Sequence, residues 1–445
     1  MLIIMIPIMI QNGITNFVNM LDNVMIGSVG NVEMTGVAIA NQLIFVFNLC
    51  IFGAISGASV FGAQFYGKGD HKGLQYTLRF KLILCLILTL ASMGVFSVFG
   101  NQLIGLYLSG EGNPKEIALS LRYAKEYMFI MFWGLIPYVL GQCYSSTLRE
   151  TGETRVPMFA GLASVVVNLC LNYILIFGKF GAPELGVKGA AIATVISRFV
   201  ELLVVAIWTH LHTVKNKFVV GLYTSLHIPK QLIKQISIKG FPLLINETMW
   251  AAGMALINQS YSTRGYEVVA ANNICQTFFN VFGVSFMAVG AAIAIILGQL
   301  LGAGKLEEAK DTSRKLIAFS VFVSTIVACV FYMCAGWIPK FYNTSDSVRN
   351  MAGSLMRICA LTLPIEAMPH ACYFTLRSGG KIYVTLLFDS AFVWCISLPV
   401  AFALTSGTVL SVLAVYAICQ SLNLIKCVAG CILVEKGIWI KNIVE

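Results

Sequence analysis

Long apolar stretches follow one another along the whole of this chain. An α-helix needs roughly 20 apolar residues to cross a bilayer, and about twelve stretches reach that length. They lie near residues 1–26, 36–66, 82–108, 126–146, 157–177, 189–210, 240–262, 268–301, 316–338, 354–375, 383–404 and 410–434. Some are long for a bilayer, so we expect tilt or interfacial ends. The pattern predicts an all-α integral membrane protein with twelve transmembrane helices.

Composition supports one membrane-embedded body. Of the 445 residues, 58% are hydrophobic and only 11% are charged, and no stretch is polar enough for a separate extramembrane domain. The first apolar run begins at Met1 and lacks the small-residue cleavage pattern of a signal peptide. The thirteen cysteines are scattered, mostly in apolar runs, and their spacing indicates neither zinc sites nor a disulfide framework. We interpret them as small buried hydrophobic residues.

Basic residues alternate between the two sides of the predicted membrane region. One set of connections, together with the tail after residue 434, carries 19 of the 30 Lys and Arg residues. The other set, with Arg357 just inside its span, carries nine, and Arg198 and Lys426 fall within spans. Under the positive-inside rule the richer set is cytoplasmic, as are both termini. The positive charges behind the net charge of +10 therefore indicate the membrane topology, and they do not indicate a nucleic-acid-binding surface.

The chain contains an internal repeat. A shift of 235 residues places Pro7 on Pro242 and Gly67 on Gly302, and a shift of 228 places residues 147–149 on 375–377. Each half holds six spans, so the halves share one orientation. We expect two six-helix lobes, 1–210 and 240–445, related by a pseudo-twofold axis along the membrane normal. Residues 211–239 are the predicted cytoplasmic linker, and the binding site is expected between or within the lobes.

One glycine-rich segment imitates a phosphate-binding loop. Residues 62–69 nearly match that motif, but Gly69 stands where a Ser or Thr should bind magnesium. The segment also ends an apolar helix and has no strand before it. We therefore interpret it, and its repeat counterpart at 297–305, as helix ends with glycine C-caps.

Acidic residues inside the apolar stretches are the candidate functional residues. Asp22, Glu247, Glu366 and Asp389 all lie within predicted spans. A carboxylate at membrane depth costs about 2.5–3.5 kcal/mol on insertion scales, and it usually faces a cavity or a partner. Such residues indicate a protein that moves ions or cationic molecules.

Several motifs resemble those of the multidrug and toxic compound extrusion (MATE) transporters, and in particular the NorM-like branch. The resemblance covers essentially the whole chain, and its motifs are Asp22–Gly27, Ala63–Asp70, Leu148–Gly152, Asn168–Gly178 and Leu376–Gly380. It implies twelve helices in two lobes and efflux of organic cations or other amphipaths, driven by inward Na⁺ or H⁺. Members of this family usually begin with a short polar segment, so we expect the natural start of the chain to lie upstream.

The resemblance assigns roles to three of the acids. Asp22 matches the acidic position of the first helix, although a helix-capping role is the alternative. Glu366 lies eleven residues before Arg377, which is the spacing of the tenth-helix acid in the NorM-like branch. The nearby Pro364 and Pro369 free backbone carbonyls for a cation or water. The alternative for Glu366 is a buried carboxyl that is hydrogen-bonded to such backbone.

The seventh-helix acid matches the family less closely. Glu247 lies five residues after Pro242, whereas the NorM-like acid would fall near Trp250, one turn later. One turn keeps a similar face but changes depth by about 5 Å, so the role carries over and the position does not. Trp250 either stacks on a cation or is an interfacial or core residue.

Two asparagines and one further acid complete the candidates. Asn168 and Asn172 share a helix face; the branch with a proton-linked amino-terminal lobe usually has Asp at the second position, and Asn172 cannot titrate. Asp22, Asn168 and Asn172 could instead bind Na⁺, as could Glu247 and Glu366. Hydrogen bonding between helices is the alternative for the asparagines. Asp389 either lines the carboxy-terminal cavity or pairs with a neighbouring helix.

The leading hypothesis is therefore a monomeric, plasma-membrane antiporter without a cofactor, which exchanges cationic or amphipathic substrates for Na⁺ or H⁺ by alternating access. Its partners are small molecules and membrane lipid, and no nucleic acid. A lipid-linked precursor flippase of the same superfamily is the runner-up, but it needs a cationic cavity. An integral-membrane enzyme is the third hypothesis. Its best candidate, His210 with His212, has no nearby acid or Cys to complete a metal site.

Overall fold

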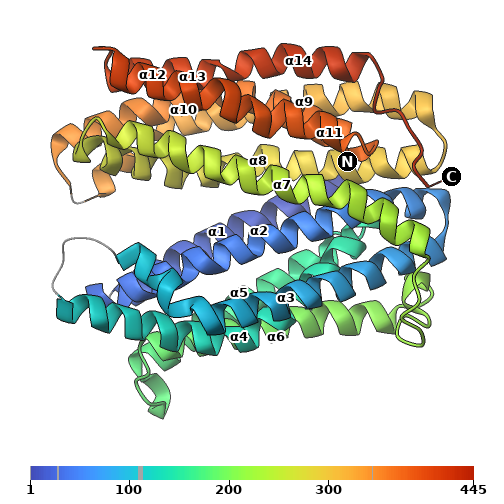
Figure 1. Ribbon diagram of the computed structural model, residues 1–445, viewed down its shortest axis with the longest axis horizontal. Helices are drawn as coiled ribbons and strands as arrows, with labels where there is room; N and C mark the ends of the chain where they lie inside the picture. The colour runs from blue at the N-terminus through green and yellow to red at the C-terminus, as the bar shows by residue number, and fades with distance from the viewer. Residues whose placement is uncertain (1, 28–29, 109–113, 343, 445) are drawn as a thin grey trace. The chain divides into compact units, whose positions relative to one another are not determined.

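The structure is a computed structural model that describes residues 2–27, 30–108, 114–342 and 344–444. The side chains at 18–24, 27, 31, 106–108 and 114 also lie outside the described part. Within the described residues every regular element is a helix and no strand occurs (Figure 1). This confirms the all-α prediction.

Six long helices form the amino-terminal half. They are α1 (Leu2–Gly27), α2 (Asn31–Lys68), α3 (His71–Leu108), α4 (Pro114–Glu150), α5 (Arg155–Phe177) and α6 (Val187–Leu211). Two short 3₁₀ turns, η1 (Lys179–Gly181) and η2 (Lys217–Val219), lie in the connections that flank α6.

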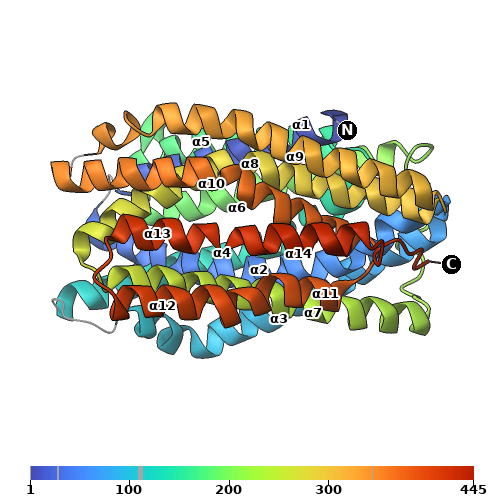
Figure 2. The same ribbon diagram turned by 90° about the horizontal axis from the view of Figure 1, so that it is seen from above.

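The carboxy-terminal half repeats this plan with an irregular eleventh helix. It contains α7 (Lys230–Ser262), α8 (Tyr266–Gly302), α9 (Leu306–Cys334), the 3₁₀ turn η3 (Ile338–Phe341) and α10 (Asp346–Ser378). The eleventh helix consists of α11 (Ile382–Leu386), the π-helical η4 (Leu387–Ala391) and η5 (Val393–Ser397), and α12 (Leu398–Gly407). The twelfth consists of α13 (Val412–Ser421) and α14 (Asn423–Glu435). Each of these composite helices runs as one rod (Figure 2).

Ten helices in the described part of the chain are long and apolar enough to cross a membrane. The remaining two are α1, whose apolar segment is described only over Leu2–Phe17, and α7. The α7 helix is less apolar because Asn246, Glu247 and Thr248 lie at its middle. Together they give the twelve helices that the sequence predicts, in a multi-pass membrane protein.

The helices extend beyond the predicted spans. The longest described helices have 38 residues, about 57 Å at 1.5 Å per residue, whereas the hydrocarbon core is about 30 Å thick. Thus α4 begins at Pro114 and α7 begins at Lys230, twelve and ten residues before the predicted spans. Hydropathy marks only the part of a helix that lies in lipid, and polar turns continue it into the aqueous region.

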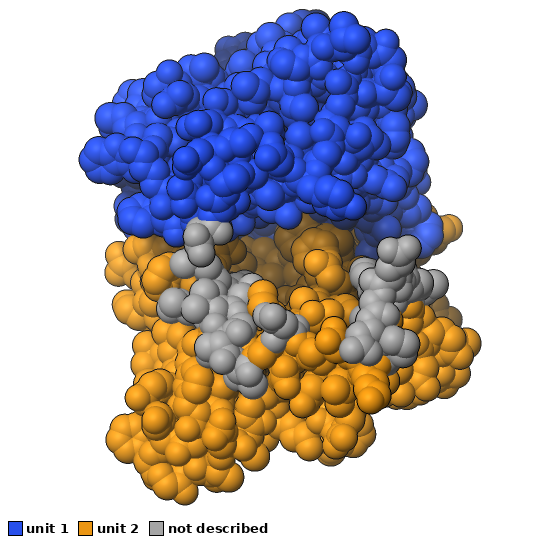
Figure 3. Space-filling view, turned by 90° about the vertical axis from the view of Figure 1, so that its left-hand side faces the viewer, with its two compact units in different colours: residues 1–9, 63–69, 241–445 blue, residues 10–62, 70–240 orange. Residues whose placement is uncertain are grey.

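The chain divides into two compact units (Figure 3). Unit 2 comprises residues 10–62 and 70–240, and unit 1 comprises residues 1–9, 63–69 and 241–445. In unit 2, α6 packs against α4 and α5, and α3 packs against α4. In unit 1, α10 packs against α8, α9, α13 and α14. The α10 helix is therefore the central helix of unit 1, and its side chains reach most of the others.

The ends of α2 and α8 meet within unit 1 at a pair of glycines. A Cβ atom on Gly67 would lie 2.0 Å from the carbonyl oxygen of Gln299, and one on Gly302 would lie 1.9 Å from that of Gln64. Gly69 and Gly304, just beyond these helix ends, have φ values of 79° and 74°. The left-handed conformation confirms the predicted glycine caps.

The carboxy-terminal tail covers this contact. Gln64 donates to the carbonyls of Ser378 (2.9 Å) and Lys441 (3.3 Å) and accepts from the backbone N–H of Ile443 (2.8 Å). Lys68 donates to the carbonyl of Val444 (2.7 Å), and Trp439 is completely buried. We call residues 64–68, 299–302 and 439–444 the tail clasp.

We expect Gly302→Ala to weaken the tail clasp. The new methyl group overlaps a backbone oxygen that only a shift of α2 can move, and overpacking of this kind typically costs about 1–3 kcal/mol. The melting temperature of the purified protein in detergent should fall. Gly94→Ala is the control, since Gly94 lies within α3 and no atom lies within 4 Å of the place that its new methyl group would take. Equal melting temperatures for the two variants would contradict the packing described here.

Candidate functional site

One face of α10 carries a row of polar side chains. Glu366, His370, Tyr373 and Arg377 follow at spacings of four, three and four residues, which places them on the same side of the helix. The row from Glu366 to Arg377 spans about 16 Å along the helix axis. Because α10 is central in unit 1, the row faces several other membrane helices.

Glu247 of α7 lies at the Arg377 end of this row. Its Oε1 atom lies 3.8 Å from Nη1 of Arg377 and accepts a hydrogen bond from the Tyr373 hydroxyl at 3.4 Å. The neighbouring Asn246 donates to the same hydroxyl at 3.2 Å. Arg377 is only 5% exposed and Glu247 17%, so the two opposite charges are held together away from water.

Asp389 lies in the π-helical part of the eleventh helix. Lys426 of α14 donates to its Oδ1 atom at 2.8 Å, and Asn246 donates to its Oδ2 atom at 3.4 Å. The adjacent Ser390 places its hydroxyl 2.7 Å from Oδ1 of Asn246 and 2.8 Å from its carbonyl oxygen. A π turn is a local widening that is frequent at functional sites, and here it carries Asp389 to both α7 and α14.

Glu366 has a different kind of partner. The amide of Asn423, at the start of α14, donates to its Oε1 atom at 2.8 Å. Within the described part of the chain, no Lys, Arg or His forms an ion pair with Glu366. Of the three candidate acids in unit 1, Glu247 and Asp389 each lie beside a base, whereas Glu366 is held by an amide.

The prolines of α10 explain a nearby contact. In a helix the N–H of residue 369 would bond to the carbonyl of Ile365, but Pro369 has no N–H. The thiol of Cys427 on α14 donates to that carbonyl instead, at 3.3 Å. A carbonyl freed by proline thus meets the same helix that holds Glu366 and Asp389.

We call the three acids Glu247, Glu366 and Asp389 and the two bases Arg377 and Lys426 the unit 1 charge network. With histidine counted as neutral, its formal charge is −1. In the structure, two of these acids lie beside bases, and the surplus charge is left with Glu366.

The basic and amide members of this site were not predicted from the sequence. Arg377 was interpreted as a loop charge, and Lys426 only as a charge within a span. No sequence prediction included Asn246, Tyr373 or Asn423. A polar or charged side chain inside an apolar stretch is the sequence signal that identifies such residues. A buried base is as costly as a buried acid, so the signal holds for Lys and Arg as well as for Asp and Glu.

Trp250 lies one turn after Glu247 on α7. Its side chain is 37% exposed, and the hydrogen bonds and ion pairs of the charge network do not involve it. A different tryptophan, Trp394 of the π-helical segment, donates to the carbonyl of Met249 at 2.9 Å. The eleventh helix is therefore hydrogen-bonded to α7 through Asp389, Ser390 and Trp394.

The candidates of the amino-terminal half are described only in part. Asn172 donates to Oδ1 of Asn168 at 3.1 Å, and Asn168 donates to Thr194 of α6 at 3.3 Å. Both asparagines are buried, and their amides link α5 to α6. Asp22 lies on α1, and its side chain is outside the described residues.

Unit 2 contains a buried ion pair that was not predicted from the sequence. Lys81 of α3 is fully buried and pairs with Glu150 of α4, which is 3% exposed. The ammonium also lies 3.1 Å from the hydroxyl groups of Ser146 and Thr147. Lys81 and Glu150 were expected in connections between spans. The structure places them inside long helices, where they join α3 to α4.

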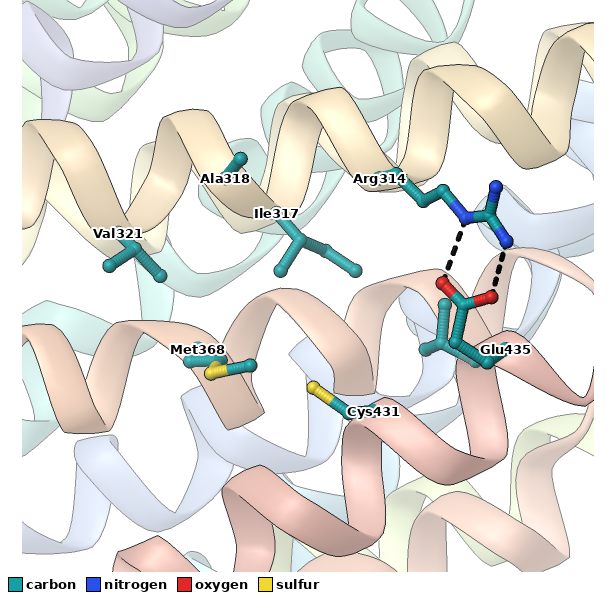
Figure 4. A pocket seen from close by; sticks show the side chains of 8 residues that line it. Arg314, Ile317, Ala318, Val321, Met368, Cys431 and Glu435 are labelled. Carbon is teal, nitrogen blue, oxygen red and sulfur yellow. Dashed lines mark hydrogen bonds and ion pairs between the residues drawn. The ribbon is translucent and has the colours of Figure 1, made fainter.

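A separate groove lies between α9, α10 and α14 (Figure 4). Its volume is about 470 Å³, and its wall is mostly apolar; Arg314 and Glu435 form an ion pair at one end. The only α10 residue in its lining is Met368, two positions from Glu366 and so on the opposite face of that helix. The groove does not contain the charge network.

The charge network can bind a cation through oxygen atoms. The described residues contain no group of three or more His, Cys, Asp or Glu side chains placed to hold a metal ion. Carboxylates next to amide oxygens, hydroxyl groups and proline-freed carbonyls are suited to a hard monovalent ion, a proton or an organic ammonium.

Twelve membrane helices with paired charges buried inside them define an integral-membrane transport protein. The chain belongs to the MatE family, whose model matches residues 7–174 and 242–405. The match covers both halves and confirms the MATE resemblance. Members of this family are transporters and not enzymes.

Curated relatives agree with this assignment. "Probable multidrug resistance protein NorM" of Thermotoga maritima is 27% identical over 89% of this chain and 83% of its own length. "Probable multidrug resistance protein YoeA" of Bacillus subtilis is 22% identical over 94% of this chain and 89% of its own length. Relatives named NorM from several bacteria also match, as the predicted NorM-like branch requires.

Solved structures show the same fold. An outward-facing multidrug resistance MATE transporter of the MOP superfamily matches with a TM-score of 0.88 and 18% identity, over 98% of this chain and 94% of that one. A MOP superfamily transporter from Pyrococcus furiosus matches with a TM-score of 0.86 and 18% identity, over 98% and 95%; it is described as having a binding pocket of reverse polarity.

We expect Lys81→Met to destabilise the protein strongly. It leaves the buried carboxylate of Glu150 without its ion partner, which typically costs about 3–5 kcal/mol. The double variant Lys81→Met/Glu150→Gln should recover much of the loss, because it removes both charges. Melting temperatures in detergent measure both effects. Lys315→Met, at the exposed pair with Asp311, is the control and should change little; a single variant as stable as the control would contradict this account.

Proposed function

We propose that this chain is a secondary active antiporter that exports organic cations or other amphipathic drugs from the cytoplasm in exchange for Na⁺ or H⁺. The names of the curated relatives, which are probable multidrug resistance proteins, support the substrate class. The formal charge of −1 on the unit 1 charge network supports a cationic ligand.

Glu366 is the observation that carries the proposal. Arg377 and Lys426 already balance two of the three acids, so an arriving cation meets one surplus negative charge. Asn423 holds Glu366 through a neutral amide. A cation can therefore bind to the Glu366 carboxylate without first displacing a Lys or Arg side chain. A carboxylate without a basic partner at membrane depth raises the free energy of the protein. Binding of a cation neutralises the charge and offsets this cost.

Coupling then follows from competition for this charge. A drug cation and a coupling ion cannot both neutralise Glu366, so binding of one favours release of the other. Alternating access requires in addition that the two ligands bind the inward-open and outward-open states unequally. For Na⁺ the proposed oxygen ligands at this place are the Glu366 carboxylate and the side-chain oxygen of Asn423.

A second cation site is proposed in the amino-terminal half. Asp22 with Asn168 and Asn172 supplies one carboxylate and two amide oxygens. The two asparagines already lie within hydrogen-bonding distance of each other, so one ion can contact both. Glu247 and Asp389 are proposed to shape the carboxy-terminal site through their bases, and Trp250 to contact an aromatic or cationic substrate.

We infer that both termini lie in the cytoplasm, because the connections rich in Lys and Arg mark that side of the membrane. We further propose that the protein is a monomer in the plasma membrane, as the family resemblance implies. The moving bodies are the lobes 1–210 and 240–445, joined by the linker 211–239. The tail clasp then lies at the cytoplasmic side of the membrane.

The charges disfavour the alternative of a lipid-linked precursor flippase. Recognition of a pyrophosphate needs unpaired bases in the cavity. Arg377 lies against Glu247 and Lys426 against Asp389, so these two bases are already balanced by acids. The reversed pocket polarity of the Pyrococcus furiosus relative belongs to that protein.

We expect Glu366→Gln to abolish or strongly weaken drug resistance without loss of expression. The substitution keeps the size of the side chain and removes the surplus charge. Resistance of cells to a panel of cationic drugs measures the effect, and membrane immunoblots control for expression. Glu307→Gln makes the same chemical change at an exposed position and should leave resistance intact. Normal efflux by the Glu366 variant would refute the assignment of this site.

Efflux measurements in membrane vesicles identify the coupling ion. We expect efflux of a fluorescent cation to accelerate when a Na⁺ gradient or a pH gradient is imposed, each tested separately. An ionophore that collapses the effective gradient should stop efflux. Transport that depends on ATP and ignores both gradients would contradict secondary antiport.

A further inference from the structure

Lys426 lies within a membrane helix, where an ammonium group is as costly as a carboxylate. Its Nζ atom lies 2.8 Å from Oδ1 of Asp389, and the two side chains are 12% and 20% exposed. The same atom lies 5.5 Å from the ring centre of Phe388 and 5.7 Å from that of Phe392. One carboxylate with two aromatic rings is the environment that recognises an organic ammonium ion. The ammonium group of Lys426 therefore fills a place that would otherwise suit a cationic ligand.

This internal ammonium lies next to the surplus charge. Asn423 and Lys426 are three residues apart on α14, so their side chains emerge about 5–6 Å apart on one face. Asn423 holds Glu366 and Lys426 holds Asp389. The carboxylate of Glu366 on α10 thus faces an amide, and the carboxylate of Asp389 on the eleventh helix faces an ammonium group, at neighbouring positions of α14.

The other charged and titratable groups described at this place are Glu247, Arg377, His370, Tyr373 and Cys427. Tyr373 donates its hydroxyl hydrogen to Glu247, and Cys427 donates its thiol hydrogen to the carbonyl of Ile365. Glu247 and Arg377 offset each other, and the imidazole of His370 packs against the rings of Phe286 and Phe374. With Lys426 present the network has a charge of −1. Without it the charge is −2, and the space beside Asp389 is open to a ligand.

We propose that Lys426 is a tethered cation that limits the unit 1 charge network to ligands with one positive charge. The inference rests on the proposed function, because it specifies which cations that site accepts. Lys426 fills the subsite at Asp389, and only the subsite at Glu366 is left for a monovalent ligand. Removal of the Lys426 charge exposes two adjacent carboxylates, which suit a dication.

Ethidium and propidium test this proposal as a matched pair. They share one fluorescent ring system, and propidium carries a second fixed positive charge. Binding of both dyes is measured by fluorescence on purified protein in detergent. We expect Lys426→Met to raise the ratio of propidium to ethidium affinity at least about tenfold over wild type. Lys234→Met, at an exposed position of α7, controls for loss of a positive charge elsewhere and should leave the ratio unchanged.

The double variant Asp389→Asn/Lys426→Met distinguishes an electrostatic effect on the dye ratio from a steric effect. It restores the formal charge of −1 while keeping the shortened side chain, so its dye ratio should return to that of wild type. An unchanged ratio in Lys426→Met would overturn the proposal. So would a double variant that keeps the shifted ratio, because the effect would then be steric. Asp389→Asn alone, with a charge of zero, should bind ethidium more weakly than the double variant, and this comparison holds even if Lys426→Met does not fold.

A drug-independent measurement distinguishes this inference from the proposed function. Thermal stabilisation by Na⁺ and by Ca²⁺ is compared in the same proteins. Lys426→Met should gain stabilisation by Ca²⁺ that wild type and the double variant lack. If wild type binds neither dye but this gain appears, the drug-transport proposal fails and the tethered cation stands. If the dyes bind wild type but Lys426→Met shifts neither the dye ratio nor the response to Ca²⁺, the tethered cation fails alone.

Discussion

The structure of unit 1 depends on one constraint, which is that hydrocarbon does not solvate a charge. Each charged group placed among these helices needs a partner from another helix. Arg377 of α10 meets Glu247 of α7, and Lys426 of α14 meets Asp389 of the eleventh helix. These pairs tie four helices together, and the π-helical turns at 387–397 and the prolines of α10 are the backbone irregularities that accompany them.

In the proposed function, the same constraint lets the charge network bind and release a cation. If every charge were paired, a cation would gain nothing by entering. If several acids were unpaired, the empty site would be too costly and would release a cation too slowly. A single surplus charge at Glu366, held by an amide, lies between these extremes. Transport needs this balance, because a site must bind on one side of the membrane and release on the other.

The sequence predicts the helices well and the pairing of the buried charges poorly. Apolar length marks the spans, and the repeated glycines at 67 and 302 mark matching helix ends, because both signals are local. The contact of Lys426 with Asp389 joins separate helices and has no local signature. Lys81 shows a related error: its basic character suggested a loop, but α3 begins at His71 and the lysine meets Glu150 inside the protein. The π turns around Asp389 likewise lack a sequence signal and depend on packing against α7.

The tail clasp has a consequence for how the protein is made. Gln64 accepts a hydrogen bond from Ile443, 379 residues further along the chain. At 5–20 residues per second, synthesis of that length takes roughly 20 to 75 s. Throughout this interval Gln64, at the end of α2, lacks the tail residues that later cover it. Closure of this end of unit 1 therefore has to wait until residues 439–444 have been made, long after α2 itself has been inserted.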